Sequence, residues 1–191
     1  MKRKKKKIEV KDENTQVSIK KLTVPSFQSL TVFEKCFWSG DESRGPHGDE
    51  LKMQRKAIGV LVKGDNADAC PAPVLTLQDP CLPEAFKQVF SSANLHSLTA
   101  VQMQCWPAIL SGLNVLAVAP TGSGKTFAYG LAMAPHILSQ LKGKDGVLGK
   151  SPYALVLVPT RELAIQVASA LKVHSDQVIP PSHWTLTDLE T

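Results

Sequence analysis

Apolar residues in the second half of the chain recur in several segments with the period of an amphipathic helix. Phe86, Val89 and Phe90 stand at i, i+3 and i+4, so a helix that starts at Pro83 would carry all three on one face. Thr99 suits the N-cap of a second helix, because its hydroxyl can accept a hydrogen bond from a free N–H of the first turn. Four helices are predicted. The first begins at Pro83, the second follows Thr99 and ends at Leu110, the third begins near Gly124, and the fourth runs from Arg161 to about His174.

Two short segments between these helices are apolar almost throughout. They are residues 114–119 and residues 153–158, and Pro159 ends the second. Apolar runs of this length indicate strands that are buried on both faces. The order strand, helix, strand, helix therefore predicts an α/β fold in which helices cover a parallel sheet. Residues 71–174 are expected to form this domain.

The N-terminal segment has a different composition, with lysine or arginine at every position of 2–7. Residues 1–21 hold nine basic and three acidic residues, a net charge of +6, so residues 22–191, with 13 basic and 14 acidic residues, carry −1. A basic segment with little apolar area is expected to be disordered. The basic run predicts a nuclear or nucleolar address combined with weak RNA contact, while a non-specific phosphate grip or a solvated tail would also account for it.

Residues 22–70 mix short apolar runs with glycine and proline, and are interpreted as a linker or pre-domain segment with one short extended stretch at 58–62. No apolar run approaches the roughly 18 residues that cross a bilayer, and none follows the N-terminal lysines as in a secretory signal. No membrane partner is therefore expected. The irregular spacing of the cysteines predicts free thiols, and none of the five histidines is assigned a catalytic role. The cysteines are Cys36, Cys70, Cys81 and Cys105.

One motif carries recognisable chemistry, because residues 119–126 lie between a predicted strand and a predicted helix in the manner of a phosphate-binding loop. Gly122 and Gly124 let the backbone curl so that N–H groups face a β-phosphate, and the helix N-terminus adds a partial positive charge. Lys125 would reach the β- and γ-phosphates and the Thr126 hydroxyl would ligate Mg²⁺, so ATP with Mg is the predicted ligand. A glycine-rich turn without a ligand is the alternative. The loop consists of Ala119, Pro120, Thr121, Gly122, Ser123, Gly124, Lys125 and Thr126, with alanine at the first glycine position of the pattern.

Two further segments narrow this broad class. Residues 159–164 read PTRELA after the second predicted strand, and residues 98–102 read LTAVQ before the loop. Together with the loop they resemble motif Ia, the Q motif and motif I of the DEAD-box RNA helicases of superfamily 2. The resemblance covers roughly residues 62–174, with three motifs in the family's order and spacing. It implies a RecA-like P-loop NTPase domain, ATP and Mg as cofactors, RNA as partner, and ATP-dependent separation of short RNA duplexes.

The resemblance also implies roles for single residues. Gln102 would hydrogen-bond the adenine edge, because a side-chain amide offers one donor and one acceptor; a residue of the helix surface is the alternative. The start of the last helix would hold an RNA phosphate through free N–H groups and a guanidinium, unless Arg161 pairs with a neighbouring acid. The residues implied in RNA contact are Pro159, Thr160, Arg161 and Glu162.

Three positions depart from the family's pattern. Leu77 stands where the family has an aromatic residue that stacks on adenine, so an apolar contact remains without the π-face. Leu98 stands where proline is usual, and Asn94 stands near a usual glycine. Asparagine tolerates the left-handed backbone conformation that glycine supplies.

The 191 residues contain no DEAD sequence, no SAT sequence and nothing that resembles a second motor domain. Hydrolysis needs a carboxylate that orients water and an arginine finger, so this chain is expected to bind ATP without useful turnover on its own. Residues 175–191 do not continue the resemblance, which suggests a truncated or alternatively terminated product with an incomplete sheet. A non-catalytic nucleotide- or RNA-binding module and another P-loop ATPase or kinase stay as alternatives. The basic tail suggests ribonucleoprotein partners, as in ribosome assembly.

Overall fold

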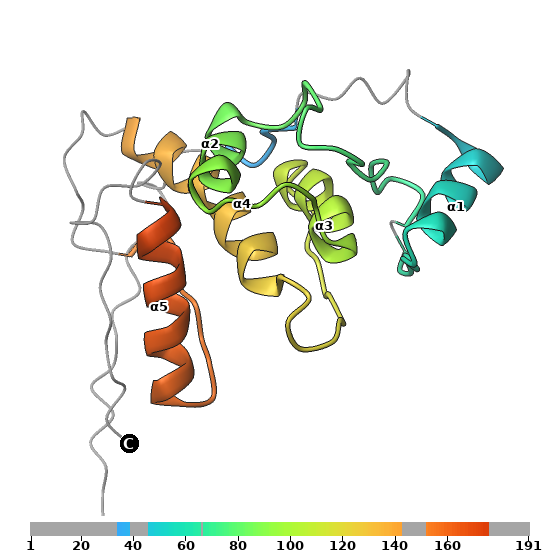
Figure 1. The fold of residues 1–191 in the computed structure, drawn as a ribbon. Helices are drawn as coiled ribbons and strands as arrows, with labels where there is room; N and C mark the ends of the chain where they lie inside the picture. Colours follow the sequence, from blue (N-terminus) through green and yellow to red (C-terminus); the bar gives the residue numbers. More distant parts are fainter. Residues whose placement is uncertain (1–33, 39–45, 66, 143–151, 176–191) are drawn as a thin grey trace, which may run out of the picture. The chain divides into compact units, whose positions relative to one another are not determined.

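A computed structural model describes residues 34–38, 46–65, 67–142 and 152–175, all within one unit, Phe33–Thr191. The described residues form five helices (Figure 1): α1 Gly48–Ala57, α2 Glu84–Ser92, α3 Ala100–Leu110, α4 Lys125–Lys142 and α5 Arg161–Ser175. Within those ranges, no helix combines the length and the apolar character that crossing a membrane requires. The predictions for the basic segment 1–21 and for the C-terminal residues 176–191 lie outside the described residues.

The four predicted helices are confirmed by α2, α3, α4 and α5. Pro83 is the N-cap of α2, which buries Phe86, Val89 and Phe90 together as their spacing predicts. Asn94 has a φ of 53°, the left-handed conformation expected where the family has glycine. Helix α1 was not predicted, and it lies in the segment interpreted as a linker.

The predicted parallel sheet is not found in the described residues. Residues 114–119 and 154–158 form no strand, and Figure 1 accordingly draws no arrow before α4 or α5. Leu116 is 94% exposed and Leu155 is 72% exposed, so these side chains are not buried as predicted. A strand needs the N–H and C=O groups of a neighbouring strand, and neither segment has such a partner in the described ranges. The α/β class therefore stays a prediction.

The core forms where α2, α3 and α4 meet, around the fully buried Trp106. Phe86 and Phe90 of α2 present their rings edge-on to Trp106, with centroids 4.9 and 5.5 Å from it. Edge-to-face packing suits the opposite charges of ring edge and ring face. The indole N–H of Trp106 donates to the backbone oxygen of Phe127 at 3.2 Å, so its one polar atom is satisfied inside the core. This bond ties the middle of α3 to the first turn of α4.

Helix α3 contains a proline, and the carbonyl that it leaves unused has a partner from elsewhere in the chain. Pro107 has no N–H to donate to the backbone oxygen of Met103 four residues earlier. That oxygen accepts the N–H of Val74 at 2.9 Å instead. The segment that leads into α2 is thereby attached to α3 at the residue next to Gln102.

The carboxyl end of α3 is satisfied by a segment from far upstream. The backbone oxygen of Leu110 accepts the N–H groups of Phe37 and Trp38 at 2.6 and 3.1 Å. The ring of Phe37 also meets His136 of α4 edge-on, at a centroid distance of 4.7 Å. Since the last carbonyls of a helix have no partner within it, residues 34–38 supply what α3 lacks at this end.

All four cysteines are free thiols in the structure. Burial raises the pKa of the Cys70 thiol, an effect partly offset by the charge of Arg55, and burial also raises the pKa of Cys105. Cys36 is exposed. The two buried thiols therefore hold their protons to higher pH, and less of the reactive thiolate is present near neutrality.

Two leucine substitutions test the packing. Leu110 is fully buried and Leu116 is 94% exposed. Leu110→Ala should lower the free energy of unfolding by about 2–5 kcal/mol, because it removes buried apolar area and leaves a cavity. Leu116→Ala should change it by less than about 0.5 kcal/mol, as is usual on a surface. Urea denaturation measures both, and a large effect of Leu116→Ala would show that residues 114–118 are buried in solution.

Thiol alkylation tests the burial of the cysteines. With iodoacetamide at about pH 8, Cys36 should be modified first, while Cys70 and Cys105 react slowly because burial limits both access and thiolate formation. Peptide mass spectrometry over time gives the order. Equal rates for Cys36 and Cys70 in the native protein would contradict the structure.

Candidate phosphate-binding site

The predicted phosphate-binding loop leads directly into the N-terminus of α4. Lys125 is the first residue of α4 and Thr126 is the second, so the loop's last two functional residues belong to the helix itself. The first N–H groups of a helix have no partner within it, and its dipole places partial positive charge there. An anion that approaches the loop would therefore meet backbone donors and the Lys125 side chain at one place.

The two loop glycines both adopt left-handed backbone conformations, as the sequence predicts. Gly122 has a φ of 78° and Gly124 a φ of 82°. A β-carbon on Gly124 would lie only 2.5 Å from Nε2 of Gln102 and 3.2 Å from the hydroxyl oxygen of Thr99, while one on Gly122 would meet nothing within 4 Å. Gly124 is thus required for its conformation and also because the start of α3 lies against it.

Gln102 occupies the gap between α3 and the loop. Its side chain is only 3% exposed. Its Oε1 accepts the backbone N–H of Thr99 at 3.0 Å, which is one half of a capping box, and its Nε2 donates to the backbone oxygen of Gly124 at 3.3 Å. Gln102 therefore lies against the predicted phosphate-binding loop. Its predicted bonds to adenine are not tested, and both polar atoms of its amide have protein partners here.

Lys125 turns back over the loop that precedes it. Its Nζ donates to the backbone oxygens of Ala119 and Pro120 at 2.6 and 2.7 Å. These two carbonyls hold the ammonium at the entrance of the loop. To bind a phosphate, Lys125 would exchange two neutral acceptors for charged ones, which form stronger hydrogen bonds.

The hydroxyl groups of the loop complete the set of donors. The Ser123 hydroxyl oxygen is buried and has no hydrogen-bond partner among the described residues. The Thr126 side chain is half-buried in the first turn of α4. Backbone amides, one ammonium and two hydroxyls fit a phosphate with a divalent cation, because phosphate takes N–H donors and Mg²⁺ takes oxygen ligands.

The predicted RNA-contacting residues lie at the N-terminus of another helix, α5, which packs against α4. All four residues of 159–162 are exposed. Thr160 precedes α5 and caps its start: its hydroxyl accepts the N–H of Leu163 at 3.3 Å and its backbone oxygen accepts the N–H of Ala164 at 3.1 Å. This exposed helix start could contact a phosphate, and no described contact tests that role.

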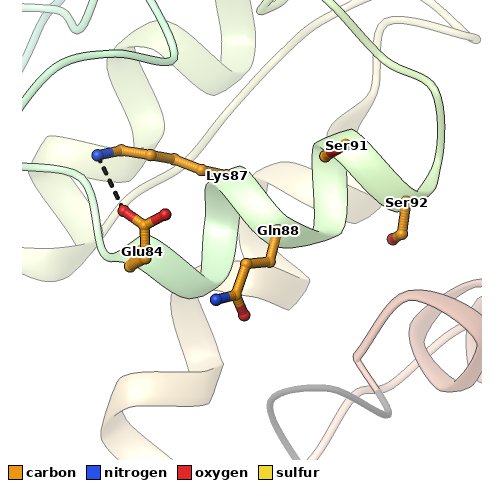
Figure 2. A pocket seen from close by; sticks show the side chains of 5 residues that line it. All are labelled: Glu84, Lys87, Gln88, Ser91 and Ser92. Carbon is orange, nitrogen blue, oxygen red and sulfur yellow. Dashed lines mark ion pairs between the residues drawn. The ribbon is translucent and has the colours of Figure 1, made fainter.

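A polar hollow lies elsewhere, over one face of α2. Figure 2 shows that every side chain around it comes from that helix, with Lys87 paired to Glu84 at 3.2 Å. A single helix face offers no converging donors from several elements, so we assign this hollow no binding role. The residues around it are Glu84, Lys87, Gln88, Ser91 and Ser92.

One feature of the site could have been found in the sequence. Thr99 and Gln102 have the spacing of a capping box, which predicts that the Gln102 side chain folds back onto the backbone of Thr99. The contact of Gln102 with Gly124 joins residues 22 positions apart. No local pattern could have predicted that contact.

The comparisons with known proteins agree on one family. A family model for the DEAD/DEAH box helicase matches residues 99–187. An ATP-dependent RNA helicase DBP2 from Candida albicans is 35% identical over 149 residues, which are 76% of this chain and 25% of the relative. The DBP2 helicase from Eremothecium gossypii is 37% identical over 76% of this chain and 26% of the relative. The chain thus spans about a quarter of the length of these curated relatives.

A solved structure is also similar. The RNA-helicase Prp28 from Chaetomium thermophilum, bound to ADP, superposes with a TM-score of 0.53 and 26% sequence identity. The match covers 72% of this chain and 32% of the Prp28 chain. The likeness is therefore one of fold over the matched part of the chain.

A pair of glycine substitutions tests the loop geometry. Gly122→Ala should lower the free energy of unfolding by about 1–2 kcal/mol, because the residue has positive φ, and Gly124→Ala should lose at least as much for the same reason. Gly124→Ala should cost clearly more, since its β-carbon also displaces the Gln102 amide. Urea denaturation of both variants gives the difference. Equal losses would mean that Gln102 moves aside freely.

Proposed function

We propose that this chain, whose sequence matches the DEAD-box RNA helicase family, is the ATP-binding N-terminal part of such a helicase. The observation that supports this function best is the contact between Gln102 and Gly124, which packs the Q-motif helix α3 onto the phosphate-binding loop. The φ of Gly124 and the Gln102 side chain beside it already require glycine at this position. A glycine there lets the backbone approach a ligand on its other side.

In the proposed complex, the amides of the loop and Lys125 bind the phosphates, and the Thr126 hydroxyl contributes to a magnesium ion held through ATP. The bound ion would neutralise phosphate charge. Lys125 must first leave the oxygens of Ala119 and Pro120, so its bonds there keep the loop closed until a phosphate replaces them. Gln102 would recognise adenine with whichever of its polar atoms it releases from Thr99 or Gly124.

RNA is the proposed second ligand, held at the exposed start of α5 by residues 159–162. Duplex separation coupled to ATP hydrolysis is proposed for the helicase as a whole. The 191 residues contain no DEAD sequence to orient the attacking water, so we propose that this chain alone binds ATP with negligible turnover. The basic residues 2–7 support a nuclear or nucleolar location and work on ribonucleoproteins such as ribosome precursors.

A non-catalytic nucleotide- or RNA-binding module is the second candidate for this chain, and both candidates predict that the 191 residues alone have negligible ATP turnover. ATP hydrolysis should be negligible with RNA present, whereas MgATP should bind. RNA-stimulated hydrolysis by the purified 191-residue chain would contradict the proposed lack of turnover and exclude the non-catalytic module. A malachite green assay for released phosphate measures this directly.

The Lys125→Ala substitution tests the site itself. It should weaken MgATP binding by at least about tenfold, because the ammonium makes charge-assisted bonds to the phosphates. Lys87→Ala, which removes an ammonium from the surface of α2, is the matched control and should leave binding unchanged. Isothermal titration calorimetry gives the affinities, and a filter assay should show RNA binding intact in both variants. Unchanged MgATP affinity in Lys125→Ala would remove the loop from the proposal.

Base selectivity tests Gln102 separately. MgATP should bind more tightly than MgGTP, because the donor and acceptor of the amide match N6 and N7 of adenine. Gln102→Glu should reduce this preference, since a carboxylate offers no donor to N7. Equal affinity for both nucleotides in the unsubstituted protein would leave Gln102 with its capping role alone.

A further inference from the structure

We propose that Arg55 of α1 is a positioning residue, which fixes α3 and thereby holds Gln102 against the phosphate-binding loop. The inference rests on the proposed nucleotide site and adds a residue outside the three family motifs. It also gives a function to α1, which the sequence did not predict.

Helix α1 has almost no apolar attachment of its own. None of its ten residues is fully buried, so the burial of apolar area contributes little to holding it in place. The guanidinium of Arg55 makes the attachment instead. Its Nε donates to Oε1 of Gln104 at 3.0 Å, and its Nη2 donates to the backbone oxygens of Cys70 and Pro71 at 2.8 and 3.3 Å.

The three residues that accept hydrogen bonds from Arg55 are buried. Gln104 is 7% exposed, and while its Oε1 accepts from Arg55, its Nε2 donates to the backbone oxygen of Pro71 at 2.9 Å. The amide of Gln104 therefore has a partner at each end. A buried acceptor that loses its partner is costly, so Arg55 and Gln104 fix each other's orientation.

Arg55 is bonded to the same turn of α3 that carries Gln102. Gln102 contacts Gly124 of the loop, the backbone oxygen of Met103 accepts from Val74, and Gln104 binds Arg55. Three successive residues are thus attached to three separate parts of the chain. Gln102 and Gln104 are two residues apart in one helical turn, where the rise is about 1.5 Å per residue. A shift of the backbone at Gln104 therefore moves Gln102 with it.

Arginine suits this place for a geometric reason. The planar fork of the guanidinium reaches a side-chain oxygen of α3 and two backbone oxygens of residues 70 and 71 at once. A lysine would keep the charge and could bond one of these acceptors well. A lysine could not bond Gln104 and the backbone oxygens of residues 70 and 71 at once, so charge alone does not account for the role.

The test uses the complete 191-residue chain. Arg55→Gln removes the fork, Arg55→Lys keeps the charge, and Lys52→Gln is the control on the same helix, where Lys52 pairs with Asp49 at 3.0 Å on the exposed face. Affinity for MgATP is measured by calorimetry at a temperature at which thermal denaturation shows every variant folded. Hydrogen exchange is measured for the amides of residues 102–104 and 124–128.

Both Arg55 variants should weaken MgATP binding by roughly 2- to 30-fold, the range of energetic coupling through packed elements, with Lys52→Gln unchanged. Exchange should quicken at residues 102–104 and also at 124–128, which a role confined to attaching α1 would not produce. If the Arg55 variants bind MgATP and exchange their loop amides as the unsubstituted protein does, the inference is overturned and the proposed function stays intact. Failure of the unsubstituted protein to bind MgATP would overturn the proposed function, and the exchange of residues 124–128 would still decide whether Arg55 positions the loop.

Discussion

The site depends on the hydrogen bond between the side-chain amide of Gln102 and the backbone of Gly124. The amide is buried, it caps the start of α3, and it donates to the backbone of Gly124 in the phosphate-binding loop. A buried amide of this kind tolerates little displacement, because each lost partner leaves an unsatisfied polar group. The position of α3 therefore determines the shape of the loop. The other contacts of α3, which its Trp106 makes in the core and its carboxyl end makes with residues 34–38, serve the same placement.

Much of the helical framework could be predicted from the sequence, because helices leave local signals. Pro83, the face of Phe86 and Phe90, and the N-cap Thr99 each act within a few residues, and each is found in its predicted place, although the predicted bond to the Thr99 hydroxyl is not formed. The loop was predictable for the same reason, since its glycines and Lys125 are adjacent in the chain. Helix α1 was missed because it buries none of its residues and so leaves no apolar stripe to detect.

The sheet shows the opposite case. The apolar character of residues 114–119 and 153–158 predicts strands, yet a strand depends on its neighbours and these segments have none in the described ranges. Contacts between residues far apart in the chain could not be predicted from local sequence patterns either. Arg55 with Gln104 and Gln102 with Gly124 join segments that are 49 and 22 positions apart, and only the packing of α3 brings them together.

Pro107 has a consequence for how this domain could change by mutation. Replacing it with a residue that has an N–H would let the helix use the Met103 oxygen internally, and that oxygen now accepts from Val74. A change that improves the isolated helix would therefore compete with an attachment between distant segments. At this position local helix propensity opposes the attachment of the Val74 segment to α3, so a substitution chosen for thermal robustness would weaken a tertiary contact beside Gln102.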